Sequence, residues 1–340
     1  MSFLSKRFFR LLLLCGVGII ILSLVVAYYY ACSGTSKYKD CYHIVKVFNG
    51  MGNQFFEYSF GYILEKETGQ KVCYDLSFFS KPNNQRESHE VLMLDKFNVD
   101  MHNVVVFKKK YNKRLFGLKR RYEIIGNFDN VFRFDKEENL FFNNRRKVFT
   151  YNYFSEKYFD KYKDDLLKLF ELKVPLNEKN QKMLKEIKRH KNSVSIHIRR
   201  GDYLKYSQYR DVVTIDNYYN KALKVFDNMK DVHYFVFSND TKWAKENLKT
   251  NKPTTYVDIN GETDAYFDFE LMKNCKHHIN SNSTFSYWVS YLSVHEDGIV
   301  VAPKKLNNDA TEQDRRKSLN LKDWVLIDNF KNKVDKIYYY

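Results

Sequence analysis

The chain has 340 residues, of which 44% are hydrophobic and 17% aromatic, and this composition excludes an intrinsically disordered protein. A formal net charge of +16 favours an anionic partner such as a phosphate, a charged sugar or a membrane surface, although a solvated lysine-rich surface would produce the same excess. The sequence has neither zinc-finger spacing nor a ribonucleoprotein motif, so we expect no nucleic acid partner.

The first element in chain order is an apolar run. Residues 11–30 contain no charged side chain, and about 20 such residues can cross a bilayer as a helix. The run is preceded by the basic residues Lys6, Arg7 and Arg10, and this favours a cytoplasmic N-terminus. A cleaved signal peptide is the alternative. We expect a single-pass type II membrane protein with a cytoplasmic tail (1–10), a transmembrane signal-anchor (11–31), a stem (32–42) and a lumenal remainder.

A lumenal location permits disulfide bonds. Four cysteines follow the apolar run, and their spacing indicates no pairing: Cys32, Cys41, Cys73 and Cys275. Two N-glycosylation sequons begin at Asn239 and Asn282. Both lie in segments that are candidates for a functional role, which argues against their occupancy.

The stretch after the stem predicts a strand, a glycine turn, a helix and a second strand. Apolar and polar residues alternate from residue 43 until the chain reaches Gly50 and Gly52. Apolar residues then recur at helical spacing over 54–69, ending on Gly69, a typical helix C-cap. A strand follows at 71–79. This order is typical of a βαβ unit.

The remainder also predicts alternating strands and helices. We assign no elements to 86–150; amphipathic helices are expected at 155–172 and 177–191, with a domain boundary near Val174–Pro175. Beyond it, strands are expected at 193–199, 232–240, 255–258, 277–279 and 299–302, and helices at 216–229, 241–249, 264–274 and 284–294. Such alternation predicts a second, doubly wound parallel sheet.

Two arginines follow the strand in "SIHIRRGDY" (195–203). Ligands of open parallel sheets bind beyond the carboxyl ends of strands, and a guanidinium matches phosphate oxygens bidentately. Asp202 could orient one arginine, and Gly201 allows close backbone approach. Because successive side chains alternate, one arginine faces the crevice, and Arg200 is our candidate for it. A surface turn with a local ion pair is the alternative; the adjoining buried strand argues against an integrin-binding RGD.

Two further segments place polar groups at helix starts. "FNGMGNQFFEY" (48–58) combines two glycines with the amides of Asn53 and Gln54, but it lacks the third glycine of a dinucleotide fingerprint. "CKHHINSNSTFSYW" (275–288) runs from a strand into hydroxyl residues before an aromatic helix, an arrangement that can bind phosphate. A tight structural turn and ordinary helix capping are the respective alternatives.

Together, the segments "NGMGNQFFEYSFGY", "HIRRGDY", "FSND" and "NSTFSYW" resemble the inverting α-1,2-fucosyltransferases that use GDP-fucose, over about residues 46–303. The resemblance implies an α/β fold of the GT-B type, with two Rossmann-like domains facing a cleft: an acceptor-side domain at 43–174 and a GDP-fucose-binding domain at 175–340. Animal members are Golgi type II membrane proteins, so the resemblance and the N-terminal run both lead us to expect a Golgi membrane location.

The resemblance also implies site residues. Donor-binding residues would be His197, Arg199, Arg200, Asp202, Ser238, Asp240, Ser281, Asn282, Ser283, Thr284 and Phe285. The N-terminal glycine motif would supply acceptor-side residues Gly50, Gly52, Asn53 and Gln54, with Met51 where leucine is usual. One departure is "YNYF" (151–154), where the family often has a Gly-Tyr-aromatic-Gln run; this concerns acceptor contacts and leaves the donor site intact.

The implied reaction moves L-fucose from GDP-β-L-fucose to the 2-hydroxyl of a terminal β-galactoside in a glycan, forming an α-1,2 linkage. Arg199, Arg200 and Asn53 would be catalytic, with the arginines stabilising charge on the departing diphosphate. The segments show no acidic metal-binding pair, so we expect no metal and no cofactor. Glu57 and Asp75 are candidate acceptor-side bases, and a reaction without a protein base is the alternative.

Two other functions fit the same segments. A protein O-fucosyltransferase shares the arginine motif, and "NSTFSYW" together with the anchor favours the glycan-modifying branch instead. The second is a catalytically inactive glycan-binding or scaffolding protein, against which the complete set of arginines, serines and glycines argues.

Overall fold

The computed structural model describes residues 41–80, 82, 87, 89–100, 104–105, 123–125, 146–150, 159–309, 319–329 and 337–338. The expected cytoplasmic tail and signal-anchor, almost all of the expected stem, and the "YNYF" segment lie outside these residues. Within the described part of the chain, no helix is both long enough and apolar enough to cross a membrane.

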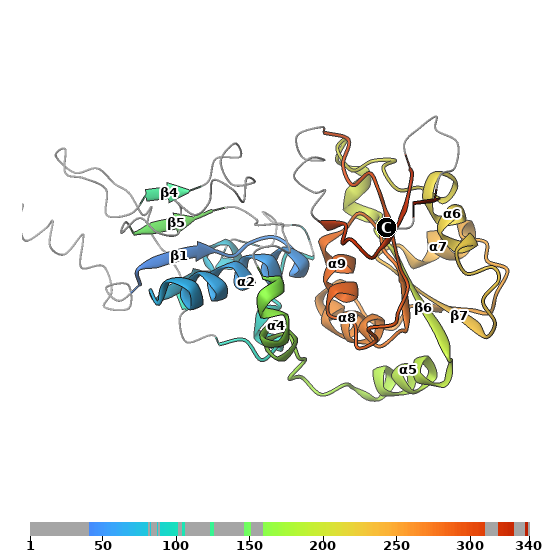
Figure 1. Ribbon diagram of the computed structural model, residues 1–340, viewed down its shortest axis with the longest axis horizontal. Helices are drawn as coiled ribbons and strands as arrows, with labels where there is room; N and C mark the ends of the chain where they lie inside the picture. Colours follow the sequence, from blue (N-terminus) through green and yellow to red (C-terminus); the bar gives the residue numbers. More distant parts are fainter. Residues whose placement is uncertain are drawn as a thin grey trace, which may run out of the picture. The chain divides into compact units, whose positions relative to one another are not determined.

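The chain divides into two compact units, Met1–Tyr42 and His43–Tyr340, and the described residues of the second unit form two sheets. Its first sheet has the strand order β3-β2-β1-β5-β4, and all its neighbouring strands are parallel. The strands are β1 (His43–Lys46), β2 (Val72–Asp75), β3 (Val104–Val105), β4 (Glu123–Ile125) and β5 (Lys147–Phe149). Figure 1 shows helix α2 (Met51–Thr68) running along this sheet.

Helix α2 forms where helical spacing predicts it, between two glycines. Gly50 caps its start in extended geometry, and Gly69, with φ of 64°, ends it by donating its N–H to the carbonyl of Glu65. The preceding strand is shorter than expected. The chain leaves the sheet because Asn49 adopts a left-handed conformation with φ of 61°, which asparagine tolerates better than most residues.

The second sheet has the order β12-β11-β10-β9-β6-β7-β8, and every neighbouring pair except β11–β12 is parallel. Its strands are β6 (Asn192–Ile198), β7 (Val232–Ser238), β8 (Thr254–Val257), β9 (His277–Ile279), β10 (Val300–Pro303), β11 (Val325–Ile327) and β12 (Ile337–Tyr338). The predicted parallel sheet is confirmed, and β11 and β12 were not expected.

Most helices of this half match their predicted ranges. They are α5 (Glu178–Arg189), α7 (Thr241–Asn247), α8 (Ala265–Lys273) and α9 (Thr284–Tyr291). Before them, α4 (Lys163–Leu169) covers only part of the helix expected at 155–172. The helix expected at 216–229 is split into a π-helical turn (Ile215–Tyr219) and α6 (Asn220–Lys224). The π-turn presents two buried tyrosines to the sheet, and the hydroxyl of Tyr219 donates to the carbonyl of His197 at 2.8 Å. The irregular turn therefore anchors the end of β6.

An aromatic cluster joins α2 to α9. Trp288 of α9 is fully buried and packs with Phe55 and Phe56 of α2 at ring distances of 5.8 and 4.8 Å. Phe170, just after α4, stacks on Phe55 at 4.0 Å. Large aromatic side chains bury the most apolar surface per residue, so this cluster holds the two helices together.

The described cysteines differ in state. Cys41 and Cys73 are disulfide-bonded. Cys275 is free and fully buried, and its thiol lies 3.8 Å from the carbonyl of Leu271.

Candidate active site

A cleft of about 680 Å³ opens where strand ends meet helix starts. Strands β1 and β6 each have neighbours of later chain position on both sides, so both occupy the position where parallel sheets bind ligands. Most of the expected site residues line the cleft: Gly50, Gly52, Asn53, His197, Arg199, Asp202, Ser238, Asp240, Ser283, Thr284 and Phe285.

The two arginines after β6 have different surroundings. Arg199 lines the cleft, and its Nη2 lies 2.7 Å from Oδ1 of Asp202, with its guanidinium over the ring of Tyr203. Arg200 is not among the lining residues; its guanidinium lies 4.0 Å from the ring centre of Trp243, and its Nε donates to Asp240 at 3.2 Å. The alternation of side chains holds, but Arg199 is the arginine that faces the cleft.

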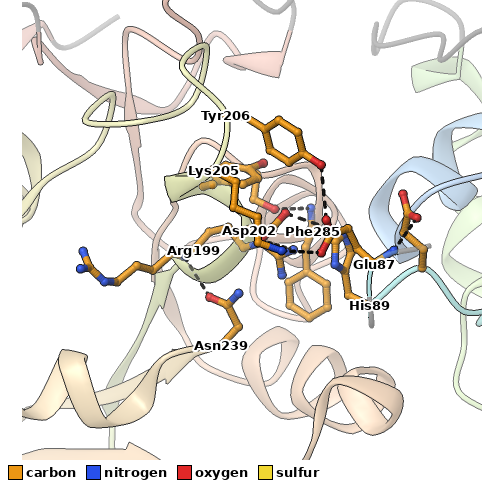
Figure 2. A network of polar contacts seen from close by, with 12 residues as sticks. Glu87, His89, Arg199, Asp202, Lys205, Tyr206, Asn239 and Phe285 are labelled. Atoms are coloured by element: carbon orange, nitrogen blue, oxygen red, sulfur yellow. Dashed lines mark hydrogen bonds and ion pairs between the residues drawn. The ribbon is translucent and has the colours of Figure 1, made fainter. Parts of the chain in front are cut away.

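The turn between these arginines and η7 (Gly201–Leu204) is held by Asn239. Its Oδ1 accepts the backbone N–H of Arg200 at 2.9 Å (Figure 2). A Cβ on Gly201, which has φ of 22°, would meet the Asn239 amide at 2.5 Å. Glycine is therefore needed at residue 201, and Asn239, a predicted sequon residue, has a structural role.

The buried His197 is held neutral next to the cleft. Burial, with a contribution from the Arg199 guanidinium, lowers the pKa of His197 to about 3. Its Nδ1 lies 2.9 Å from the hydroxyl of Ser281, and its ring packs on Phe285. Ser281 and Asn282 do not line the cleft, since Ser281 faces His197 and the amide of Asn282 donates to the carbonyl of Leu306 at 3.1 Å. Their contribution is to hold the strand end and the following helix in place.

The N-termini of α2 and α9 meet at the cleft. A Cβ on Gly52 would lie 2.5 Å from the carbonyl carbon of Thr284 and 2.6 Å from the backbone nitrogen of Phe285. The hydroxyl of Thr284 donates to Oδ1 of Asn53 at 2.9 Å, and Ser283 caps α9 by accepting the N–H of Phe285. Two helix starts, each the positive end of a helix dipole, thus converge on one space.

The residues expected at the end of β7 brace Arg200. Asp240 caps α7 by accepting the N–H of Trp243 and also accepts from Arg200. The hydroxyl of Ser238 accepts the N–H of Asp240 at 3.0 Å. These two residues border the cleft while fixing the turn that follows β7.

Three residues expected on the acceptor side lie away from the cleft. Gln54 is fully buried, donates to the carbonyls of Asn49 and Val91, and accepts the N–H of Met93. Asp75 is buried and accepts both the backbone N–H and the hydroxyl of Ser77. These polar groups lie inside the protein and support the side of the cleft formed by β1 and α2, which we call the N-terminal wall.

The third, Glu57, is also fully buried and outside the cleft lining. Its Oε2 accepts the N–H of Phe48 at 2.9 Å, and burial raises the pKa of its carboxyl well above the usual value. A carboxyl in this position holds the turn after β1. It does not face the space in which a substrate would sit.

Comparison with known proteins identifies this arrangement. The family model described as glycosyl transferase family 11 matches residues 43–328. The chain belongs to glycosyl transferase family 11. The expected resemblance is thereby confirmed.

Individual relatives agree with this membership. The chain is 32% identical over 280 residues to the O-antigen biosynthesis glycosyltransferase WbnK of Escherichia coli, covering 75% of this chain and 92% of that protein. An alpha-1,2-colitosyltransferase of Escherichia coli is 29% identical over 297 residues, covering 76% and 90%. The galactoside alpha-(1,2)-fucosyltransferase 1 of Homo sapiens is 30% identical over 146 residues, or 40% of each chain.

Several cleft residues of this family 11 protein were not predicted from sequence. Glu87, His89 and Glu90 line the cleft, and Glu87 pairs with Lys205 at 3.0 Å (Figure 2). The tyrosines after the arginine motif form a group on the other wall, with Tyr203 and Tyr209 stacked at 4.5 Å. The spacing of Tyr203, Tyr206 and Tyr209 was a visible signal, whereas nothing near Glu87 indicated a motif.

The cleft does not share the positive charge of the whole chain. Its described lining residues include one arginine and one lysine, Arg199 and Lys242. The acidic lining residues are more numerous: Glu87, Glu90, Asp202, Asp240, Asp258, Glu262 and Asp268. Burial raises the pKa of Asp268 to about 7, and its Oδ1 accepts from the amide of Asn260 at 2.7 Å. Recognition of an anionic ligand here must therefore rest on local donors.

Proposed function

We propose that this family 11 protein transfers L-fucose from GDP-β-L-fucose to the 2-hydroxyl of a terminal β-galactoside, with inversion, forming an α-1,2 linkage. The observation that carries the proposal is the position of Arg199 in a cleft at which two helix N-termini meet. Fucosyl transfer leaves a diphosphate, and these are the groups that stabilise such a leaving group. The names of two relatives, with their α-1,2 linkages, support the stated linkage.

The geometry suggests how the donor is held. A guanidinium has five N–H donors, and the ion pair with Asp202 engages one edge and orients the remainder. The hydroxyl of Thr284 and the first N–H groups of α9 adjoin the same space. We propose that the diphosphate lies against these donors, and that they replace a metal ion. In this arrangement, the halves around the two sheets would act as the donor and acceptor domains of a GT-B enzyme.

Stabilisation by these groups would be largest in the transition state. As the bond from the sugar carbon to the phosphate oxygen breaks, charge accumulates on the diphosphate. Preorganised donors at that position need no rearrangement, and losing one typically costs about 10²–10³ in rate. Arg199, oriented by Asp202, is the strongest candidate for such a donor.

The direct test is a transfer assay with the residue 43–340 unit or the full chain. GDP-fucose is incubated with a free β-galactoside, and the linkage of the product is determined by NMR. We expect an α-1,2-linked fucosyl galactoside, formed in the presence of a chelator. No transfer to any β-galactoside would overturn the proposal.

The similarity to an alpha-1,2-colitosyltransferase over most of both chains supports a second candidate donor. A nucleotide-activated colitose should therefore be compared with GDP-fucose at equal concentration. A higher kcat/KM for colitose would change the donor sugar while leaving the linkage and the site unchanged.

Other predictions about this enzyme come from sequence alone. Protein O-fucosylation is the alternative enzyme activity, and it is distinguished by using a folded protein domain as acceptor in the same assay. The Golgi membrane location and type II anchor stay predictions, based on the apolar run at 11–30. They are checked by protease protection of a tag placed after Tyr340.

A further inference from the structure

No candidate base predicted from sequence faces the cleft, although fucosyl transfer must remove a proton from the acceptor hydroxyl. Glu57 and Asp75 are buried behind the N-terminal wall. His197 lines the cleft but its Nδ1 is engaged by Ser281. The other lining residues are therefore the candidates for a protein base.

His89 occupies a suitable position. It lies on the N-terminal wall against Gly50, because a Cβ on that glycine would meet its Cδ2 at 3.0 Å. Its Nε2 lies 3.9 Å from Oδ2 of Asp202, whose Oδ1 contacts Arg199 (Figure 2). One carboxylate thus stands between the arginine of the leaving-group site and an imidazole on the opposite wall.

The chain on either side of His89 is held in place. Gln54, fully buried, accepts the N–H of Met93 and donates to the carbonyl of Val91, so the chain just after His89 is fixed to the start of α2. On the other side, Glu87 is tied to Lys205 and lies 3.4 Å from the hydroxyl of Tyr206. The buried Gln54 therefore contributes to the site indirectly, by fixing the backbone that follows His89.

From this geometry, and on the basis of the proposed fucosyl transfer, we propose that His89 is the general base that takes the proton from the acceptor hydroxyl. Asp202 orients the ring by facing its Nε2, which leaves the Nδ1 lone pair for the acceptor. Among the described residues, no hydrogen bond engages that Nδ1. A histidine held by an aspartate on one nitrogen and basic on the other is a recurrent arrangement in enzymes.

The step is balanced without a further reactant. A lone pair of the acceptor oxygen forms the bond to the anomeric carbon, and the bond from that carbon to the phosphate oxygen breaks, its electron pair leaving with GDP. The proton of the hydroxyl moves to His89 and is later released to solvent. The separation of 3.9 Å between His89 and Asp202 is the longer geometry often seen before substrate binds.

The protonation state of His89 fits this role. Burial, with the Arg199 guanidinium, lowers its pKa, while Asp202, Glu90 and Glu262 raise it by smaller amounts. The ring is therefore neutral and able to accept a proton at pH 7. Activity should decline only when the pH falls below the usual pKa of histidine, about 6.5.

The test compares His89→Gln and His89→Ala with the wild type in the fucosyl transfer assay. We expect kcat to fall at least about a hundredfold, the lower end of the usual contribution of a general base, while the affinity for GDP changes less than about threefold. The acidic limb of the wild-type pH profile should disappear in His89→Gln. Added imidazole should partly restore His89→Ala, which a merely structural role would not allow.

Glu87→Gln is the matched control, because it loosens the same segment without removing the imidazole. We expect it to raise KM for the glycan and to keep the acidic limb. Wild-type turnover in His89→Gln, or an unchanged acidic limb, would overturn the assignment of the base while leaving the proposed transfer in place. If the wild type itself transfers no sugar, both the proposed function and this inference fail.

Discussion

The two walls of the cleft use their polar residues differently. On the wall formed by β6, β7 and α9, most expected polar residues border the cleft, including Arg199, Asp202 and Thr284. On the wall formed by β1 and α2, Gln54 and Glu57 point into the protein and hold backbone groups, as does Asp75 at the end of the neighbouring β2. The first wall offers fixed charges to a ligand, whereas the second offers backbone, Asn53 and a separate segment carrying His89.

Under the proposed function, one wall would bind the diphosphate and the other the acceptor glycan. A diphosphate is the same in every reaction of a given donor, so its charges can be met by residues built into strand ends. Acceptor glycans vary, and a wall whose contacts come from loops can change without altering the scaffold. Substitutions on each wall can therefore test one side of the contrast.

The largest effect is expected at Arg199, on the wall formed by β6, β7 and α9. Arg199→Lys keeps the charge but loses the guanidinium fork, and we expect turnover to fall at least about a hundredfold. Arg200→Lys should lower turnover less than about tenfold, since Arg200 faces Trp243 and Asp240. Fucosyl transfer rates are compared, with thermal melting as control. A larger loss for Arg200→Lys would reverse the assignment of the ligand-facing arginine.

The next effect concerns the contact between the walls. Gly52→Ala places a methyl group 2.5 Å from the backbone of Thr284, and such overpacking typically costs about 1–3 kcal/mol. We expect the two helix starts to separate, lowering turnover about tenfold and reducing the Tm. Gly261→Ala adds the same methyl where no atom lies within 4 Å, so it is the control for melting. Equal Tm values for the two variants would show that the contact at Gly52 is not tight.

A small effect is expected at Glu57, behind the wall formed by β1 and α2. Burial raises the pKa of its carboxyl well above the usual value and so favours the neutral form, which an amide resembles. Glutamine can still accept the N–H of Phe48, so Glu57→Gln should change turnover by less than about threefold. Steady-state kinetics at pH 7 measure this. A hundredfold loss with an unchanged Tm would restore Glu57 as a catalytic candidate.

The smallest effect is a change in stability. The pKa of Asp268 is raised from 3.8 to about 7 in the folded protein, so its contribution to the free energy of unfolding is fully present below about pH 4 and is lost as the pH rises to about 7. Asp268→Asn stays neutral throughout. We expect a Tm about 2–4 °C above wild type at pH 8, the shift that about 1 kcal/mol produces, and a smaller gain at pH 5. A gain that is independent of pH would contradict this account.

The sequence by itself determined the positions of the main strands and helices and of two site motifs. Period-2 and helical spacing located α2, β6, β7 and α9, because those segments bury apolar faces whose repeat is local. The motifs around Arg199 and Thr284 could also be assigned, since residues at the end of a parallel strand or the start of the next helix must lie at one edge of the sheet. The short strands β3 to β5 and the terminal strands β11 and β12 have too few residues to show a period.

Only the tertiary structure decided which polar groups face a ligand. Gln54 and Glu57 lie on one helix with Asn53, yet only Asn53 lines the cleft, because the direction of each side chain depends on what packs against the helix. Which of the two arginines faces the cleft depends on Trp243 and Asp240, which lie some 40 residues away in sequence and hold Arg200. His89 belongs to no local pattern, and it becomes a candidate base only because Asp202 and Gly50, distant in sequence, lie beside it.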